Sequence, residues 1–217
     1  MPRSPQQHYV ASLKALMRSG TLWPLNVSMT MLDVSALLGP PGDWLMEASH
    51  CPVPYYWSYG ALEIAFQPHV PYAVDWFQIE HPTALARPRD DVAGRLLLSM
   101  DRIDLSAPPS RMLRHLRDLP NVVVATPKDA DWKTLEIHIG GVCLTYVLAD
   151  SLMPVDGIDP NALLRRFDES CQLDSIYSFR QPALEFQSPK GKYRNLSAEQ
   201  YLAAVGRRPR PDVPGAS

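Results

Sequence analysis

The sequence lacks the motifs that would assign an enzymatic function directly. It has no Gly-x-Ser-x-Gly nucleophile motif, no phosphate-binding P-loop and no dinucleotide-binding glycine fingerprint. Charge of one sign is also missing, because 21 Lys and Arg residues nearly balance 23 Asp and Glu residues. A formal net charge of -2 does not favour nucleic acid or an anionic membrane as the partner.

Cysteines and long apolar runs are equally scarce. The cysteines are Cys51, Cys143 and Cys171, an odd number without the spacing of a disulfide framework or a metal motif. Free thiols of this kind are typical of a reducing compartment. No apolar run is long enough to span a bilayer, and the first residues lack the apolar segment of a signal peptide. We therefore expect a cytoplasmic protein that does not contact a membrane.

The remaining composition is typical of a folded domain. The chain has 217 residues, of which 46% are hydrophobic and 20% charged, and this length is ample for a buried core. Its 22 prolines cluster between the periodic segments, where they separate secondary-structure elements. We expect residues 1–206 to form a single α+β domain and residues 207–217 to form a disordered tail.

The clearest strand pattern lies between Pro54 and Gln67, and it is predicted to be the central strand of the sheet. Its residues alternate between two faces, with Leu62, Ile64 and Phe66 on one and Ala61, Glu63 and Ala65 on the other. Residues 74–79 are predicted to form an antiparallel partner strand across a turn at 68–71. Both faces of this second strand carry large apolar groups, so we expect it to be buried on both sides or to lie at an interface.

Other periodic segments complete the α+β pattern. Helices are predicted at 4–20, 31–38, 110–119, 159–167 and 197–206, with Ser4 and Ser110 among the caps. Strands are predicted at 96–100, 122–124, 135–139 and 142–148, and the last two are joined by a Gly140-Gly141 turn. Segments 43–53 and 82–94 are predicted to be loops. The expected fold is a largely antiparallel sheet with helices packed on one face.

A possible internal duplication relates residues 30–80 to residues 110–150. Each segment contains a helix followed by two strands, and the two copies share the sequences Leu62-Glu63-Ile64 and Leu135-Glu136-Ile137. The pattern predicts a repeated helix-hairpin unit. Glu63 and Glu136 would then occupy matched positions on two strands that such a unit allows to pair, where they either form a carboxylate pair or are simply solvated.

Residues 30–80 also resemble a pattern found in small bacterial proteins. The resemblance rests on Leu37-Leu38-Gly39-Pro40-Pro41, Asp43-Trp44 and Trp57-Ser58-Tyr59-Gly60-Ala61-Leu62-Glu63-Ile64-Ala65-Phe66. Some of these proteins are grouped with the immunity proteins of bacterial polymorphic toxin systems. The resemblance implies a non-catalytic protein that neutralises a cognate toxin by occluding it, and it supplies no catalytic residues.

An inhibitor of this kind needs exposed aromatic anchors and charge complementary to its target rather than a reactive group. The candidate partner-binding residues are aromatic residues of one segment and acids near or in predicted loops, namely Tyr55, Tyr56, Trp57, Glu80, Asp90, Asp91, Asp129 and Asp131. Such acids could face a basic toxin. The same residues also fit the rim of an ordinary core and a solvated surface.

Two other classes of function stay open, an enzyme of the hydrolase or transferase type and a structural or adaptor protein of a secretion or defence cluster. His50 and Cys51 are adjacent, and adjacent side chains point apart on most backbones. The scattered donors His69, His81, His138 and Asp75 lack the spacing of a metal motif. We therefore expect no catalytic residues, no metal and no cofactor, and a cognate toxin as the partner.

Overall fold

A computed structural model describes residues 8–46, 51, 53–127, 132–152, 159–179 and 193–206 of the protein. The fold is α+β with a largely antiparallel sheet, as the sequence predicted. Nine strands form a large sheet in the order β12-β8-β9-β10-β11-β5-β4-β3-β2, and three form a small sheet in the order β1-β7-β6. The pairing of β1 with β7 is parallel, whereas every other strand pairing described is antiparallel.

The bounds of the elements are as follows. The strands of the large sheet are β2 (Asp43–Leu45), β3 (Tyr56–Tyr59), β4 (Leu62–Phe66), β5 (Val74–Glu80), β8 (Val122–Pro127), β9 (Trp132–Ile139), β10 (Val142–Leu152), β11 (Gln172–Phe179) and β12 (Tyr193–Ser197). The small sheet consists of β1 (Tyr9–Ser12), β6 (Arg89–Asp91) and β7 (Leu96–Ser99). The helices are α1 (Leu13–Ser19), α2 (Met31–Leu38), α3 (Pro109–His115), α4 (Pro160–Ser170) and α5 (Ala198–Gly206), with a short 3-10 helix η1 (Pro82–Ala84).

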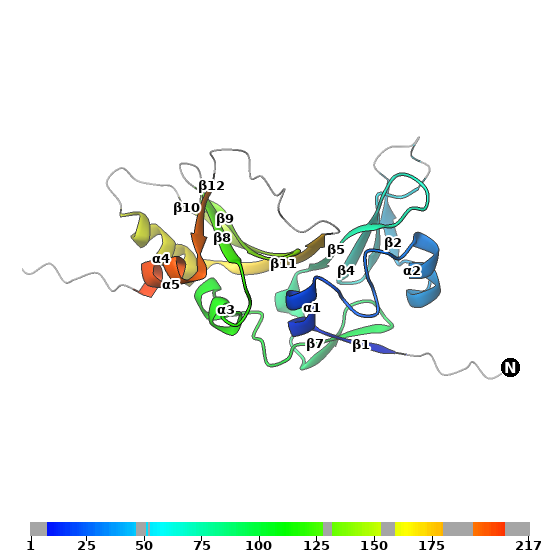
Figure 1. Cartoon of the computed structure of the whole chain (residues 1–217), viewed down its shortest axis with the longest axis horizontal. Helices are drawn as coiled ribbons and strands as arrows, with labels where there is room; N and C mark the ends of the chain where they lie inside the picture. The colour runs from blue at the N-terminus through cyan, green and yellow to red at the C-terminus, as the bar shows by residue number, and fades with distance from the viewer. Residues whose placement is uncertain are drawn as a thin grey trace, which may run out of the picture.

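Two antiparallel meanders meet in the middle of the large sheet (Figure 1). Helix α2 precedes β2, β3, β4 and β5, and helix α3 precedes β8, β9, β10 and β11, with α4 inserted before β11. The last strands of the two meanders pair with each other, so that Glu80 lies opposite Ser175 and Trp76 lies opposite Phe179. The hairpins of the suggested duplication, β4–β5 and β9–β10, belong to this one sheet with β11 between them, and the duplication itself stays a prediction.

The first helix begins later than predicted. Residues 9–12 form β1, which pairs with β7, and the helix starts only at Leu13. Ser12 is its cap, because the Ser12 hydroxyl accepts a hydrogen bond from the Ala15 amide. The proposed cap Ser4 lies outside the described residues. The helix ends as predicted at Gly20, which has the left-handed φ of 68° that glycine tolerates.

Residues 54–67 form a hairpin rather than one central strand. The chain reverses at Gly60, whose φ of 77° is readily adopted by glycine, and this turn joins β3 to β4. The centre of the large sheet is occupied by β11 instead of β4. The predicted antiparallel pairing of the next two strands is confirmed, since Ile64 of β4 lies opposite Phe77 of β5.

The two predicted loops contain short elements that carry no visible periodicity. Segment 43–53 includes β2, and segment 82–94 includes η1 and β6. Val92 and Ala93, expected in an exposed loop, are buried. Strands of three residues are too short for an alternation to stand out in sequence, so their existence depends on pairing with β3 and β7.

The helices and the small sheet pack against one side of the large sheet, which we call the covered face. In Figure 1 the sheet is a curved layer whose two ends rise, with α1 and α3 below it. Alternate residues of the strands enter the core with α1, α2, α3, α4 and α5. Fully buried strand residues on this face include Leu62, Ile64, Phe77, Ile79, Leu135, Ile137, Leu144 and Ile176.

A buried carboxylate joins three helices beneath this face. Asp168 of α4 accepts hydrogen bonds from the Ser110 amide and the Ser110 hydroxyl, both at 2.7 Å, and from the Tyr201 hydroxyl at 3.0 Å. Ser110 was predicted to cap α3 but lies inside the helix, whose cap is Pro108. The Ser110 side chain is therefore used to bond α3 to α4 rather than to start a helix.

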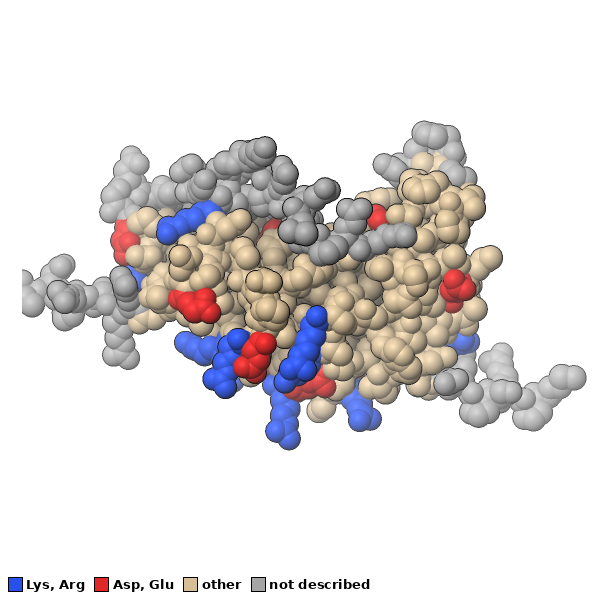
Figure 2. Space-filling model, in the orientation of Figure 1, with Lys and Arg blue, Asp and Glu red and all other residues tan. Residues whose placement is uncertain are grey.

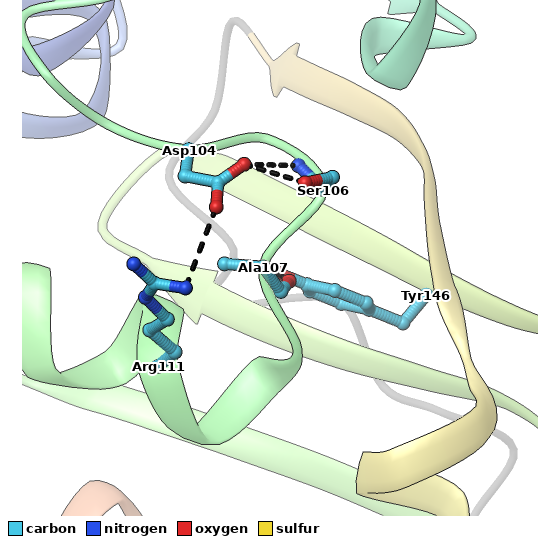
Figure 3. A network of polar contacts seen from close by, with 5 residues as sticks. All are labelled: Asp104, Ser106, Ala107, Arg111 and Tyr146. Carbon is cyan, nitrogen blue, oxygen red and sulfur yellow. Dashed lines mark hydrogen bonds and ion pairs between the residues drawn. The ribbon is translucent and has the colours of Figure 1, made fainter.

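The connection into α3 is fixed by a second set of polar contacts (Figure 3). Asp104 accepts hydrogen bonds from the hydroxyl and the amide of Ser106, at 2.6 and 3.0 Å, and lies 3.6 Å from the guanidinium of Arg111. The Ser106 hydroxyl is the main reason why the pKa of Asp104 is lowered. The Tyr146 hydroxyl of β10 donates to the Ala107 carbonyl at 3.4 Å, which holds this connection against the sheet.

Candidate functional site

The candidate site is the opposite side of the large sheet, which we call the open face because no described helix covers it. The strand registers place the following residues on this side: Asp43, Leu45, Tyr56, Ser58, Glu63, Ala65, Trp76, Gln78, Glu80, Val123, Ala125, Glu136, His138, Cys143, Thr145, Ser175, Tyr177 and Phe179. In Figure 1 this is the upper side, toward which the two ends of the sheet rise.

Five aromatic rings form a continuous aromatic cluster on the open face. Its members are Tyr55, Tyr56, Trp76, Tyr177 and Phe179. The Trp76 ring centroid lies 6.2 Å from that of Tyr55, 6.3 Å from that of Tyr56 and 6.1 Å from that of Tyr177. Tyr177 then stacks on Phe179 at 5.8 Å. Such aromatic pairs contribute stability beyond the area they bury, so the ring contacts stabilise the cluster.

Ala65 allows the rings of two non-adjacent strands to meet. It lies on β4 between Tyr56 of β3 and Trp76 of β5, and it pairs with both. Because its methyl group is small, the rings on either side approach each other above it, and Ala65 itself is only 1% exposed. The alternating sequence Leu-Glu-Ile-Ala-Phe of β4 therefore places Leu62 and Ile64 in the core and Ala65 beneath the aromatic rings.

The cluster keeps part of its surface accessible. Tyr55 is 44% exposed, and the other four rings are half-buried. The exposed apolar surface continues from Tyr55 to Leu45 of the edge strand β2, which pairs with Tyr56 and is 49% exposed. Trp44, although 58% exposed, pairs with Trp57 and therefore lies on the other side of the sheet. A contiguous exposed surface of large apolar side chains is typical of a protein-interaction site.

Two carboxylates lie beside the aromatic cluster. Glu63 pairs with Gln78 across the strands, and the side-chain amide of the buried Gln78 donates a hydrogen bond to Glu80. Burial raises the pKa of both glutamates, and the charge of Glu80 raises that of Glu63 further. The negative charge of Glu63 is also the main reason why the pKa of Tyr56 is raised.

The open face carries no compensating Lys or Arg in the strands described. Asp43, Glu63, Glu80 and Glu136 all lie on it, and no Lys or Arg forms an ion pair with any of them among the described residues. Figure 2 shows Lys and Arg side chains gathered mainly along the lower margin, below the sheet, where α1 and α3 lie. The basic residues of these helices are Lys14, Arg18, Arg111 and Arg114. The described strands therefore place carboxylates on this face without Lys or Arg, although the whole chain is nearly neutral.

A second polar group lies on the open face of β9 and β10. His138 lies directly opposite Cys143, and its Nε2 is 2.9 Å from the Oε2 atom of Glu136 on the same strand. The Cys143 Sγ atom lies 3.9 Å from the Thr145 hydroxyl. Burial, followed by the charge of Glu136, raises the pKa of the Cys143 thiol to about 12, so the free thiol is protonated at neutral pH.

The structure brings some of the sequence-predicted site residues together and separates others. Tyr55, Tyr56 and Glu80 belong to the open face. Trp57 lies on the covered face, where its ring contacts Phe66 at 4.9 Å.

The predicted acids of the loops take no part in this cluster. Asp90 and Asp91 belong to β6 in the small sheet, and their carboxylates accept hydrogen bonds from local backbone amides. Asp129 and Asp131 lie outside the described residues.

The structure does not bring the predicted carboxylate pair together. Glu63 and Glu136 are not on paired strands, because β5, β11 and β10 lie between β4 and β9. The adjacent pair of His50 and Cys51 is only partly described, since His50 lies outside the described residues.

Sequence reasoning missed Trp76, Tyr177 and Phe179 as members of the site. Part of the signal for Trp76 was present, because large apolar residues on both faces of residues 74–79 predicted a strand that is buried on both sides or lies at an interface. Tyr177 and Phe179 lie on β11, which had no predicted strand to place them. No sequence pattern predicts contact between rings that lie as far apart in the chain as Trp76 and Tyr177.

Comparison with other proteins adds no family to these observations: no protein-family model, no curated protein and no solved structure matches the chain. Among the helices described, none has both the length and the apolar character that crossing a membrane requires.

Proposed function

We propose that this chain is a non-catalytic binding protein that neutralises a partner protein, as the immunity proteins of polymorphic toxin systems do, by covering the partner with its open face. The observation that carries the proposal is the aromatic cluster beside Glu63 and Glu80, on a sheet face without described Lys or Arg. The partner is expected to be a toxin domain that presents a basic surface, in the cytoplasm of the cell that makes both proteins.

Energetic considerations favour binding over a purely structural role for this face. Tyr and Trp anchors contribute most to protein interfaces when they are held rigidly, and the sheet holds these rings in place before binding. A basic partner would add cation–π contacts to the rings, and ion pairs to carboxylates with which no Lys or Arg of the described residues pairs. The pKa of Glu63 and of Glu80 is raised in the free protein, so a neighbouring cation would stabilise both carboxylates in their charged form.

The first experiment is co-purification of the tagged chain from its native host, with mass spectrometry of what remains after a high-salt wash. Recovery of a toxin domain at near one-to-one stoichiometry is expected from the wild type. The recovered domain is then produced separately, and its toxic activity is measured with and without this chain. A partner whose activity is unaffected would contradict neutralisation even if it binds.

Matched variants locate the binding surface. Trp76→Ala is expected to weaken binding of the purified partner by at least about 2 kcal/mol, roughly 30-fold, because it removes the ring at the centre of the cluster. Trp23→Ala is the control, since Trp23 is 59% exposed but contacts Tyr9 of the small sheet instead. Equal binding by the Trp76 variant and the wild type would place the interface elsewhere.

Charge variants test the expected sign of the partner. Glu63→Gln together with Glu80→Gln is expected to slow association and to reduce its dependence on salt, because rim charges act mainly on the association rate. Asp90→Asn in the small sheet is the control and should leave the rate unchanged. Faster association of the double variant would show that the partner is acidic and would overturn the proposed complementarity.

A further inference from the structure

Three potential metal ligands of different chemistry converge on the hairpin β9–β10. Glu136, His138 and Cys143 place one carboxylate oxygen, one imidazole nitrogen and one thiol sulfur within 4.8 Å of one another. They belong to the part of the open face that the aromatic cluster does not use. Sequence analysis predicted no metal site because spacing along the chain gave no motif, whereas the strand register brings these residues together.

The sheet preorganises this arrangement. Glu136 and His138 are two residues apart on β9, so their side chains point to the same face. Cys143 lies directly opposite His138 on β10, and opposed residues of antiparallel strands have Cβ atoms about 4.5–5.5 Å apart. The Gly140-Gly141 turn that joins the strands fixes this register. Binding a small ion would therefore require rotation of side chains but no movement of the backbone.

The geometry points to a mononuclear zinc site formed by Glu136, His138 and Cys143, with the fourth position left to water. Zinc accepts this combination of oxygen, nitrogen and sulfur ligands, whereas magnesium and calcium prefer oxygen ligands alone. Ligand bonds of about 2.0–2.3 Å in a tetrahedral site place the ligating atoms roughly 3.3–3.8 Å apart. The present separation of 2.9 Å between Nε2 of His138 and Oε2 of Glu136 needs to widen only slightly.

The surroundings of the three residues fit a bound ion. Cys143 is 3% exposed, and the side chains of Glu136 and His138 are 18% and 14% exposed, so the site is shielded from solvent but not sealed by the residues described. Thr145 lies within 3.9 Å of the Cys143 sulfur and could orient it. The site is independent of the proposed function, because partner binding by the aromatic cluster needs no metal.

Zinc binding is tested directly on the full chain. The purified protein is stripped with a chelator under reducing conditions and titrated with zinc chloride in a calorimeter, and one zinc ion per chain is expected. Cobalt chloride is then used as a spectroscopic probe, and absorption from sulfur-to-cobalt charge transfer is expected. Absence of stoichiometric zinc binding by the wild type would overturn the proposal.

Variants distinguish zinc binding by these three residues from zinc binding by any available thiol. His138→Ala and Cys143→Ser are expected to weaken zinc binding by at least about 100-fold. Cys143→Ser should also abolish the charge-transfer absorption. Cys171→Ser is the matched control, because Cys171 is another partly shielded thiol that lies just after α4 and outside the cluster.

The folding of each variant is checked by circular dichroism before titration. If Cys143→Ser does not fold, His138→Ala and the isosteric Glu136→Gln still test the site without altering the buried thiol. Retained affinity in His138→Ala, or an equal loss in Cys171→Ser, would show that these three residues do not form the site.

Discussion

Trp76 and Phe77 are neighbours on β5, yet they lie on opposite faces of the large sheet. Phe77 points into the core and is 1% exposed, whereas Trp76 is half-buried within the aromatic cluster of the open face. The same strand thus supplies one aromatic ring to folding and another to a surface. Because alternate residues point to opposite faces, one strand can serve both purposes without conflict.

The carboxylates of the two faces also differ, in the groups that surround them. Asp168, beneath the covered face, accepts hydrogen bonds from three donors and fastens α3, α4 and α5 together. On the open face, burial raises the pKa of both Glu63 and Glu80; the charge of Glu80 raises that of Glu63 further, and the charge of Asp174 raises that of Glu80. Folding alone gives no reason to keep such an arrangement, whereas a basic partner would make it favourable.

The largest expected effect is a difference in stability between variants that remove either of the two aromatic rings of β5. Phe77→Ala should lower the free energy of unfolding by about 3–5 kcal/mol, because it leaves a cavity in the core. Trp76→Ala should lower the free energy of unfolding by less than half as much. The Trp76 ring is partly exposed, so removing it leaves a space that is open to solvent instead of a closed cavity. Urea unfolding of both variants measures the difference, and similar losses would show that the open face is part of the core.

The next effect tests the carboxylate beneath the covered face. Asp168→Ala should cost about 2–3 kcal/mol in urea unfolding, because the buried donors of Ser110 and Tyr201 lose their acceptor. Asp90→Ala, which removes a half-buried carboxylate that bonds only local amides, should cost less than about 1 kcal/mol. A smaller loss for Asp168 than for Asp90 would contradict the role of Asp168 in joining the helices.

Sequence patterns predicted the elements whose signals are local. The helices predicted at 31–38 and 159–167 are present as α2 and α4. A capping box of Thr30 and Asp33 begins α2, and Asp159 caps α4 through the Asn161 amide. The alternation around Ile64 gave β4 and its covered face correctly. These features depend on neighbours within a few residues, so one sequence is enough to recognise them.

Features that depend on distant pairing were not predictable in this way. The central strand β11 was missed because its register with β10 shifts between Thr145 and Tyr146, which interrupts the period of two around Asp174. The aromatic cluster joins Tyr56 to Tyr177 through Trp76, and only the order of the strands places these rings together. The Glu136–His138–Cys143 group likewise needs the hairpin register.

The smallest expected effect is the change in stability when a carboxylate of the open face is neutralised, and the pKa shift predicts its sign. The pKa of Glu63 is raised by burial and by Glu80, so the ionised group destabilises the folded state above its ordinary pKa of 4.5. Glu63→Gln should therefore stabilise the free protein by about 0.5 kcal/mol at pH 7, since solvent screens much of the repulsion. The gain should disappear as pH falls below the ordinary pKa, where the wild-type carboxyl is protonated in both states.

Glu199→Gln is the control of opposite sign. Hydrogen bonds from its own backbone amide and from the Ser197 hydroxyl lower the pKa of Glu199 at the start of α5. The ionised form therefore stabilises the fold, so this variant should be less stable than the wild type at pH 7 and equal to it in acid. Urea unfolding at both pH values measures the two variants side by side. A Glu63 variant that is less stable than the wild type at pH 7 would mean that the open-face carboxylates are compensated within the chain, and it would remove the main electrostatic argument for a basic partner.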